Sequence, residues 1–356
     1  MKLIDTIVEK ENGYILKLQE CSVSGFPTYI WGNGEGAENA RLRSNNYPFA
    51  GNVVNKRYYS ENNGCLCLED ILDNSETKIN LVIAFRGYSK GVLKDYMSKL
   101  NIVVNMDCYA GNICVDPEIM TYDYVLENIS KLEKIYSSLE DEKSREVLSA
   151  YINQKISMDY KYLKEAKTDN QYFENDIICF TENETFVDCG AYDGDSAVSF
   201  INNLKKNGIV DYKKIISFEP DPVNYRKLED RKLDRHICIN KGVSDKCEKL
   251  SFSVGGTSSG IDTSGSIMIE TDYLDNVIDG SVTFIKMDIE GSELAAIKGA
   301  SKTIVNNKPK LAICIYHRKE DMWQIQNYLH GLVPEYRFYI RAYEETATEL
   351  VLYAII

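Results

Sequence analysis

The stretch IKMDIEGSE, at positions 285–293, places charged side chains at alternate positions: Lys286, Asp288 and Glu290. Alternation along a strand would put all three on one face and the apolar residues between them on the other. The strand must end near Gly291, because SELAAIKGA then begins a helical pattern. The three charges are therefore predicted at the carboxyl edge of a sheet, where doubly wound folds bind their ligands.

A carboxylate at such an edge can take a proton from an attacking hydroxyl or orient that hydroxyl. Asp288 is the first candidate for this role, with Lys286 holding its charge and position. His317, just after the neighbouring predicted strand, is the alternative base, because the ordinary pKa of histidine suits proton transfer better. Asp288 and Glu290 could instead cap the following helix. A metal held by these two carboxylates is a minor alternative, since few other hard ligands are nearby in sequence, and no metal site is predicted.

A second polar cluster is predicted in FVDCGAYDG, where Asp188 ends a buried strand and Gly190 and Gly194 precede a helix. Glycines allow a ligand to approach the backbone, and the start of a helix offers free N–H groups. Glu219 ends the next strand, where a carboxylate can accept hydrogen bonds from both ribose hydroxyls. An acid before the glycines disfavours a pyrophosphate and suits a cationic, hydroxyl-rich ligand such as S-adenosylmethionine. The simpler interpretation is that Asp188 and Glu219 are solvated strand ends or helix caps.

An earlier glycine loop, YIWGNGEGA, also follows a predicted strand, and Gly32, Gly34 and Ala37 satisfy G-x-G-x-x-A. A dinucleotide site also needs an acid at the end of the next strand. The next strand, NVVNKRYY, offers no acid. We therefore favour a loop whose glycines only make a tight turn. The alternative is a recognition site for a nucleotide-linked or phosphorylated sugar.

The 356-residue chain has 41 basic and 54 acidic side chains and a formal net charge of −13. No cluster of Lys and Arg is present, so we expect no nucleic-acid partner. No apolar run approaches the roughly 20 residues of a membrane helix, and the first residues lack the apolar core of a signal peptide. The ten cysteines are scattered without a C-x-x-C pair, which argues against a structural zinc site. We expect a cytoplasmic protein without a membrane partner.

The pattern of strands and helices divides the chain into three parts. Residues 1–115 alternate β-rich and helical runs, which predicts a small parallel α/β domain. Residues 116–170 predict a helical connector, whose amphipathic helices could pair as the face of a homodimer. Residues 171–356 predict five strands with helical crossovers and then an antiparallel hairpin, YRFYIRAY and ELVLYAII. A Ser/Gly-rich, two-strand-like insertion lies between the third and fourth of these strands.

Four motifs in this last part, TFVDCGAYDGD, ISFEPDP, INKGVSD and TFIKMDIEGSELAAIKGA, resemble the FkbM-type methyltransferase family. The resemblance covers roughly residues 171–356, and K-x-D-x-E-G-x-E is its most specific element. It implies a class I S-adenosylmethionine-dependent fold, a Rossmann-like seven-stranded α/β sheet with the strand order 3-2-1-4-5-7-6. It also implies O-methylation, commonly of sugars or of other secondary-metabolite hydroxyls.

The resemblance also assigns roles to matching residues. Asp188, Gly190 and Gly194 would frame the methionine moiety, Glu219 would hold the ribose, and residues 240–244 would lie by the adenine. The expected cofactor-binding residues are Asp188, Gly190, Ala191, Asp193, Gly194, Glu219, Pro220, Asn240, Gly242 and Val243. The expected catalytic residues are Asp288, near the methyl group, with Lys286, Glu290 and His317.

We therefore predict an S-adenosylmethionine-dependent O-methyltransferase that acts on a hydroxyl of a carbohydrate, a glycoconjugate or a related small molecule. One alternative is an NAD(P)- or nucleotide-sugar-binding oxidoreductase or epimerase that uses the first glycine loop. Another is a non-catalytic binding protein that has kept a methyltransferase fold. Three charges on an otherwise apolar strand argue against an inert sheet.

Overall fold

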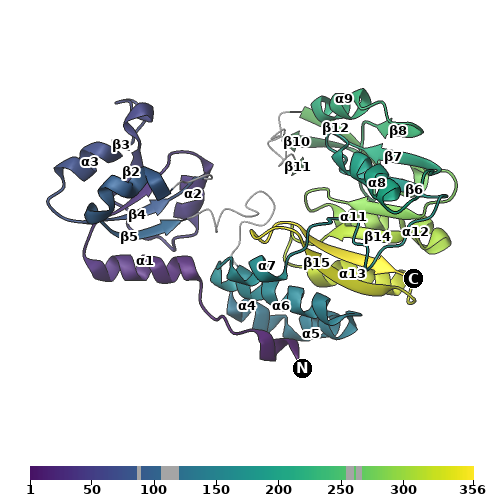
Figure 1. Cartoon of the computed structure of the whole chain (residues 1–356), viewed down its shortest axis with the longest axis horizontal. Helices are drawn as coiled ribbons and strands as arrows, with labels where there is room; N and C mark the ends of the chain where they lie inside the picture. Colours follow the sequence, from purple (N-terminus) through teal and green to yellow (C-terminus); the bar gives the residue numbers. More distant parts are fainter. Residues whose placement is uncertain (86–89, 106–119, 254–259, 262–266) are drawn as a thin grey trace.

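The computed structural model describes residues 1–85, 90–105, 120–253, 260–261 and 267–356. These residues form a small α/β unit, a group of helices and a larger α/β unit (Figure 1). The predicted boundary at residues 115 and 116 lies outside the described residues, and the three domain ranges stay predictions. No helix in the described ranges has the length and apolar character needed to cross a membrane.

The small unit is built on a five-stranded sheet in the order β3-β2-β1-β4-β5 with every pair parallel, as the alternating pattern predicts. Apolar clusters cover both faces of the sheet, so its strands are buried on both sides. The strands are β1 (Thr28–Trp31), β2 (Gly51–Val54), β3 (Leu66–Cys67), β4 (Ile79–Ile83) and β5 (Leu100–Asn105). The helices are α1 (Gly13–Ser24), α2 (Glu35–Leu42), η2 (Lys56–Tyr58), α3 (Leu68–Asn74) and η3 (Lys90–Lys99), whereas η1 (Leu3–Thr6) precedes this unit and belongs to the helical segment.

The first glycine loop joins β1 to α2 and brings α2 close to the end of β4. A Cβ atom on Gly36 would lie 2.1 Å from the carbonyl oxygen of Ala84, so only glycine fits there. At the end of β2, Asn55 accepts a hydrogen bond from Trp31 Nε1 at 3.2 Å and donates one to Glu69 Oε1 at 3.2 Å. Asn55 thus lies where a dinucleotide site would have an acid that binds the ribose. This supports the interpretation of the loop as a tight, closely packed turn.

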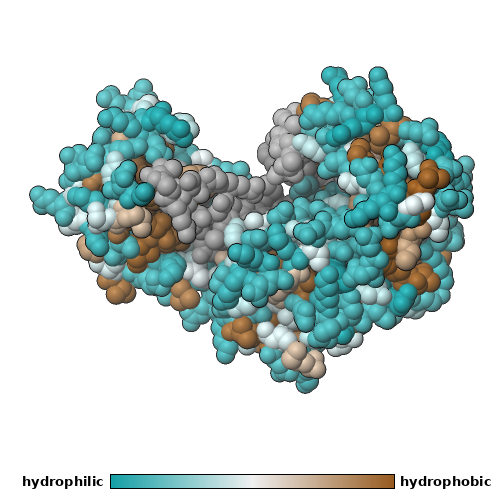
Figure 2. Space-filling model, viewed as in Figure 1, coloured by the Kyte–Doolittle hydropathy of each residue, from teal (hydrophilic) through white to brown (hydrophobic). Residues whose placement is uncertain are grey.

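The helical segment contains α4 (Tyr122–Glu127), α5 (Ile129–Ser138), α6 (Glu142–Ser157) and α7 (Lys161–Ala166), in agreement with the predicted connector. Its apolar side chains belong to the same core cluster as the larger sheet, and Leu3 and Ile7 also join this cluster. The side of these helices that Figure 2 shows is mostly hydrophilic. The helices therefore use their apolar sides within this chain.

The larger unit has a seven-stranded sheet in the order β8-β7-β6-β13-β14-β16-β15. In chain order this is 3-2-1-4-5-7-6, so the predicted topology is confirmed. Strand β16 runs in the direction opposite to the other six strands. It is therefore antiparallel to both of its neighbours, β14 and β15, and it forms the terminal hairpin with β15. The strands are β6 (Thr185–Cys189), β7 (Lys214–Phe218), β8 (His236–Ile239), β13 (Phe284–Met287), β14 (Lys310–Cys314), β15 (Arg337–Ala342) and β16 (Leu350–Ile355).

Helices and a second sheet complete this unit. The helices are α8 (Asp195–Lys206), α9 (Pro222–Asp230), α10 (Leu274–Val277), α11 (Glu293–Lys298), α12 (Ser301–Asn307) and α13 (Asp321–Leu332). The second sheet has the order β11-β10-β12-β9 and contains β9 (Gly242–Val243), β10 (Lys249–Ser253), β11 (Gly260–Ile261) and β12 (Ile267–Asp272). The predicted Ser/Gly-rich insertion corresponds to this sheet, although residues 254–259 and 262–266 lie outside the described residues.

A buried arginine joins the helical segment to the sheet. The side chain of Arg341, on β15, is inaccessible to solvent, and its Nη2 lies 2.7 Å from Asp141 Oδ2 and 3.0 Å from Asp176 Oδ2. Asp141 also accepts a hydrogen bond from Ser144 N at 2.8 Å and so caps the start of α6. The guanidinium therefore fixes the beginning of α6 against the hairpin.

We expect Arg341→Met to lower the free energy of unfolding by about 3 kcal/mol, because it leaves two carboxylates without their buried partner. The loss is at the low end for such pairs, since both carboxylates are partly hydrated. Urea denaturation measures it, with Arg337→Met, an exposed residue at the start of the same strand, as the control. Equal effects of the two substitutions would contradict this role.

Candidate active site

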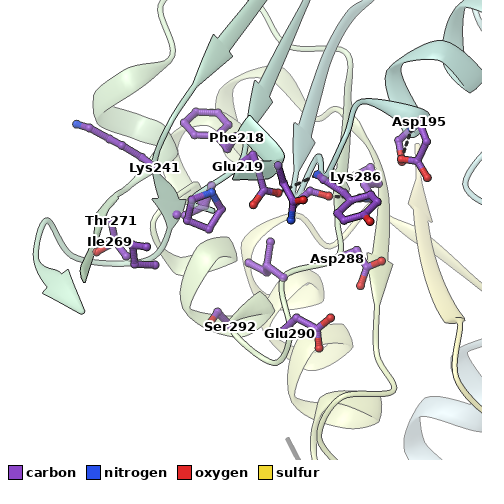
Figure 3. Close-up of a pocket in the computed structure, with 18 of the residues that line it drawn as sticks. Asp195, Phe218, Glu219, Lys241, Ile269, Thr271, Lys286, Asp288, Glu290 and Ser292 are labelled. Carbon is purple, nitrogen blue, oxygen red and sulfur yellow. Dashed lines mark hydrogen bonds between the residues drawn. The ribbon is translucent and has the colours of Figure 1, made fainter. Parts of the chain in front are cut away.

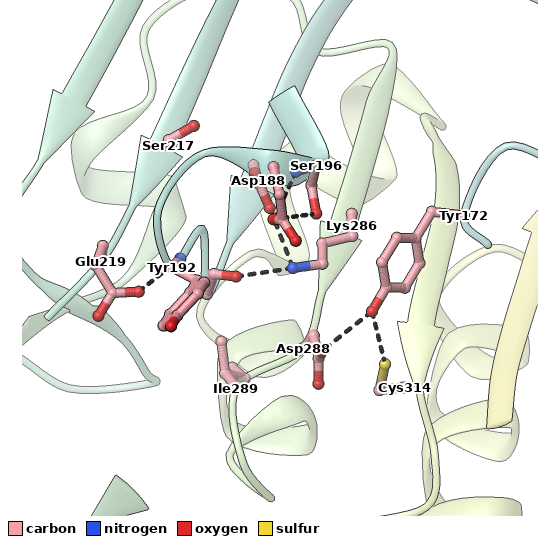
Figure 4. Close-up of polar contacts among 12 residues, drawn as sticks. Tyr172, Asp188, Tyr192, Ser196, Ser217, Glu219, Lys286, Asp288, Ile289 and Cys314 are labelled. Atoms are coloured by element: carbon pink, nitrogen blue, oxygen red, sulfur yellow. Dashed lines mark hydrogen bonds and ion pairs between the residues drawn. The ribbon is translucent and has the colours of Figure 1, made fainter. Parts of the chain in front are cut away.

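A buried lysine lies at the centre of the larger sheet. The Lys286 side chain is 3% exposed, and its Nζ lies 3.3 Å from Asp188 Oδ1 and donates to Gly190 O at 2.8 Å. The ring of Tyr172 lies 5.1 Å from the ammonium (Figure 4). Burial would lower the pKa of Lys286, but Asp188 and Asp288 reverse this and raise it. The ammonium therefore stays charged and ties β13 to the loop that follows β6.

Asp188 lies near the end of β6 and its side chain is fully buried. Burial raises its pKa to about 6, and the ammonium of Lys286 opposes the shift. Neither carboxylate oxygen of Asp188 has a hydrogen-bond partner among the described residues, although Oδ1 forms the ion pair with Lys286. A buried carboxylate with unused acceptor capacity is typical of a site that binds a polar ligand.

The loops after β6 and β13 meet at Gly190. A Cβ atom at this position would lie 1.9 Å from the carbonyl oxygen of Asp288, and the φ angle is +78°. Asp288 N donates to Cys189 O at 3.1 Å, which joins the same two loops. Glycine at position 190 is therefore required both by its backbone conformation and by this close approach.

Glu219 lies at the end of β7, where it was predicted to hold a ribose. Its side chain accepts hydrogen bonds from Tyr192 N at 2.8 Å and from Asp221 N at 2.9 Å, one on each oxygen. Burial raises its pKa to about 7, although both backbone hydrogen bonds lower it. A carboxylate has about four acceptor positions, so each oxygen keeps one for a ligand.

Asp288 is surrounded by hydroxyl donors. Tyr172 Oη donates to its Oδ2 at 2.9 Å, and Tyr316 Oη donates to its Oδ1 at 3.2 Å. Burial would raise the pKa of Asp288, but Lys286 and His317 reverse this and lower it. Asp288 is therefore ionised at neutral pH and acts as an acceptor of hydrogen bonds.

The structure corrects the predicted position of Glu290. Strand β13 ends at Met287, not near Gly291, and Glu290 has a left-handed φ of +55° in the loop that follows. The loop turns because Glu293 Oε1 accepts a hydrogen bond from Ile289 N at 2.9 Å. Burial raises the pKa of Glu290 to about 7. The position of Glu290 therefore does not follow from alternation along a strand. Its side chain nevertheless lies at the carboxyl edge of the sheet, as Asp288 does.

His317 lies behind Asp288 and Glu290. Its Nε2 is 3.6 Å from Asp288 Oδ1 and 3.5 Å from Glu290 Oε2, and its Nδ1 is 2.9 Å from Glu293 Oε1. Burial would lower the pKa of His317, but Glu293 and the other two carboxylates raise it to about 10. The imidazole is therefore held in its charged form, which makes His317 a poor base in this state.

A cavity of about 280 Å³ opens at this edge of the sheet, near the lower size limit of small-molecule sites (Figure 3). Residues of β9, β10 and β12 form one wall. The predicted residues that line it are Gly190, Glu219, Pro220, Gly242, Val243, Lys286, Asp288 and Glu290. Lys241, from the predicted range 240–244, also lines it, and lining residues that the sequence did not single out include Ser196, Thr271, Tyr316 and Glu349.

The other predicted residues lie beside the cavity rather than in its lining. Asp193 pairs with Arg231 Nη2 at 2.6 Å, and Asn240 donates to Glu219 O at 2.8 Å. Ala191 is buried and donates its N–H to Phe218 O, while Gly194 precedes α8 with a φ of +88°. These residues shape the loops that carry the lining side chains.

Tyr172 and Phe173, close together in the chain, have different positions. Tyr172 lines the cavity, whereas Phe173 is buried and packs against the rings of Phe186, Phe200 and Phe284. The segment before β6 is thus anchored by Phe173 while Tyr172 reaches Asp288.

The part of the chain that contains this site is similar to a known protein family. Residues 188–344 match the sequence profile of the Methyltransferase FkbM domain. This part of the chain is similar to FkbM methyltransferase domains. The match begins at Asp188 and includes Glu219, Lys286, Asp288 and His317, so the methyltransferase domain contains the polar residues at the edge of the sheet. The chain is therefore a methyltransferase.

Solved structures support the fold of the methyltransferase domain. The Methyltransferase FkbM from Methylobacillus flagellatus KT is similar with a TM-score of 0.72, at 23% sequence identity over 96% of this chain and 98% of that one. An rRNA methylase from Streptococcus thermophilus matches with a TM-score of only 0.31, at 13% identity over 49% of this chain and 89% of that one. The first similarity shows a shared fold, and the second is too weak to support an inference. No curated protein is significantly similar to the chain.

We expect Gly190→Ala to destabilise the methyltransferase domain far more than Gly208→Ala. Both glycines have a left-handed φ, but a Cβ at Gly208 would meet no atom within 4 Å. The control should lower the thermal midpoint by about 2–4 °C, from backbone strain alone. Gly190→Ala must also displace the Asp288 backbone, so its shift should be at least about twice as large. Similar midpoints for both variants would show that the close approach is not maintained.

Proposed function

We propose that the chain is an S-adenosylmethionine-dependent O-methyltransferase that acts on a hydroxyl of a carbohydrate, a glycoconjugate or a related small molecule. The observation that carries this proposal is the cavity that Glu219 and Asp288 share. These two carboxylates come from the ends of different strands and line one small space.

The residues present fit the cofactor. Glu219 has two acceptor positions left for ribose hydroxyls, and Gly242 and Val243 line the cavity after β8, where the adenine is expected. Asp188 lies behind the lining residues, paired with Lys286 at 3.3 Å, and its negative charge would be close to the cationic amino acid moiety. When bound, S-adenosylmethionine supplies a methyl group made electrophilic by its sulfonium.

Asp288 is suited to hold the acceptor hydroxyl. Its ionised carboxylate would accept the hydrogen bond of that hydroxyl and would take its proton when the methyl group passes from sulfur to oxygen, a transfer that leaves S-adenosylhomocysteine. Its lowered pKa makes it a weak base, so orientation is its larger contribution. Tyr172 and Tyr316 fix the carboxylate from either oxygen.

The charge of the cavity favours a neutral acceptor with many hydroxyls. Its lining contains more carboxylates than ammonium groups: Asp195, Glu219, Asp288, Glu290 and Glu349 against Lys241 and Lys286. An acceptor with a phosphate or carboxylate close to the reacting hydroxyl would be repelled. A sugar hydroxyl meets no such penalty and can bond to the acidic side chains.

We expect Glu219→Ala to weaken binding of S-adenosylhomocysteine by about 2 kcal/mol, because it removes hydrogen bonds to a charged acceptor. Isothermal titration calorimetry measures the change, and NAD serves as a ligand that should not bind. Glu229→Ala, on the exposed side of α9, is the matched control and should bind normally. Unchanged affinity in Glu219→Ala would remove this residue from the cofactor site.

We expect the protein to transfer labelled methyl groups from S-adenosylmethionine to members of a panel of monosaccharides and methyl glycosides. With any acceptor found, Asp288→Asn should lose at least about a hundredfold in turnover while still binding S-adenosylhomocysteine. Asp279→Asn, an exposed aspartate before β13, is the control. Near-normal turnover of Asp288→Asn would exclude this role.

A further inference from the structure

A second carboxylate reaches the cavity from the terminal hairpin. Glu349 directly precedes β16 and lines the same cavity as Asp288. A carboxylate oxygen of each residue lies within 4.8 Å of one from the other. Two carboxylates of different strands therefore face one small space, and the function proposed above uses only Asp288 of this pair.

The hairpin holds Glu349 in an unusual backbone conformation. Its φ angle is +71°, a left-handed value that is uncommon for residues other than glycine. Its carbonyl oxygen accepts a hydrogen bond from Tyr343 N at 3.0 Å, which pairs it with the other arm of the hairpin. The side chain is also held, because Gln171 Nε2 donates to its Oε2. Residues strained in this way are concentrated at functional sites.

One tyrosine hydroxyl connects the two carboxylates. Tyr316 Oη lies 3.2 Å from Asp288 Oδ1 and 3.4 Å from Glu349 Oε1 and can donate to either oxygen. Both distances are long for hydrogen bonds between oxygen atoms, as is common for catalytic contacts before the substrate is bound. A hydroxyl is both a donor and an acceptor. Tyr316 can therefore receive a proton from one carboxylate while it gives its own hydrogen to the other.

The two carboxylates differ in their affinity for a proton. Burial would raise the pKa of Asp288, but Lys286 and His317 reverse this and lower it. Burial raises the pKa of Glu349 to about 7, and the charge of Asp288 adds to the shift, whereas Gln171, His317 and Lys286 oppose it. A proton that reaches Asp288 is therefore more stable on Glu349.

We propose that Glu349 is the final proton acceptor of the reaction and that Tyr316 relays the proton to it from Asp288. This inference rests on the proposed function. The hydroxyl proton of the acceptor passes to Asp288 as its oxygen takes the methyl group, and the electron pair of the broken carbon–sulfur bond stays on sulfur. Asp288 then gives the proton to Tyr316 Oη as the tyrosine hydrogen passes to Glu349. Asp288 and Tyr316 end as they began, and Glu349 ends neutral.

Glu290 is the other carboxylate of the lining with a raised proton affinity, because burial raises its pKa to about 7. The imidazole of His317 lies between it and Asp288, with Nε2 at 3.5 and 3.6 Å from their oxygens. The neighbouring carboxylates raise the pKa of His317 to about 10, against the effect of burial, so its ring is already protonated. A protonated imidazole cannot accept another proton, and this favours the path through Tyr316.

The relay predicts how turnover depends on pH. Glu349 must be ionised to take the proton, so turnover should rise with pH through about 7 rather than near 4.5, the ordinary pKa of glutamate. Cys314, Tyr172 and Tyr316 also lie near it, but burial raises the pKa of each far above neutral. Glu290 titrates in the same range as Glu349, so variants are needed to separate the two.

The test measures turnover of the full chain between about pH 5 and pH 9, with an acceptor found in the methyl-transfer panel. Glu349→Gln should lose at least about tenfold in turnover at pH 8 and should lose the rise near pH 7. Tyr316→Phe should behave alike, and the double variant should be no slower than either single variant. Glu344→Gln, at an exposed glutamate between β15 and β16, is the matched control and should keep the wild-type profile. Calorimetry with S-adenosylhomocysteine checks that each variant is folded.

A second measurement needs neither cofactor nor acceptor. In protein labelled with carbon-13 at the glutamate carboxyl groups, the NMR signal that is missing from Glu349→Gln should titrate at about pH 7. A midpoint near 4.5 would overturn the relay, and so would near-normal turnover of Glu349→Gln with an unchanged pH profile. Either result would leave the proposed function intact. A wild type that transfers no methyl group to any acceptor would instead contradict the proposed function, and the relay with it.

Discussion

The buried ammonium of Lys286 is the constraint on which the rest of the site depends. A charge inside a sheet must be paired and hydrogen-bonded, and Lys286 finds its partners in Asp188 and the carbonyl oxygen of Gly190. These partners belong to β6 and to the loop that follows it, so one side chain sets the distance between the loops of two neighbouring strands. The same charge keeps Asp288 ionised. Lys286 thus positions two loops and, together with His317, favours the ionised form of Asp288.

The regular part of the fold follows from the sequence. The apolar runs of β6, β7, β13 and β14 are long enough to identify buried strands, and the last two strands identify an antiparallel hairpin, whereas the order of the strands was implied by the family resemblance. Lys286, Asp188, Glu219 and Asp288 were predictable because each lies at or just beyond a strand end, and parallel strand ends meet at one edge.

The rest of the site could not be read from spacing. Tyr316 and Glu349 come from distant segments and reach Asp288 or its neighbours only after the hairpin has packed. Their sequence surroundings show no motif. Glu290 was assigned to a strand because alternation continued, whereas a left-handed turn ends it earlier. Tertiary contacts, which a local pattern does not record, decide both cases.

The start of the chain has a consequence for how the molecule is assembled. Leu3 and Ile7 lie in the core that the helices α4–α7 share with the larger sheet, and so does Met120. The five-stranded unit is therefore an insertion, which leaves the larger body after residue 7 and returns to it before residue 120. Two covalent connections limit its rotation more than a single linker would. Evolution could exchange or enlarge such an insertion without rebuilding the core beneath it, since both connections begin from the same helical platform.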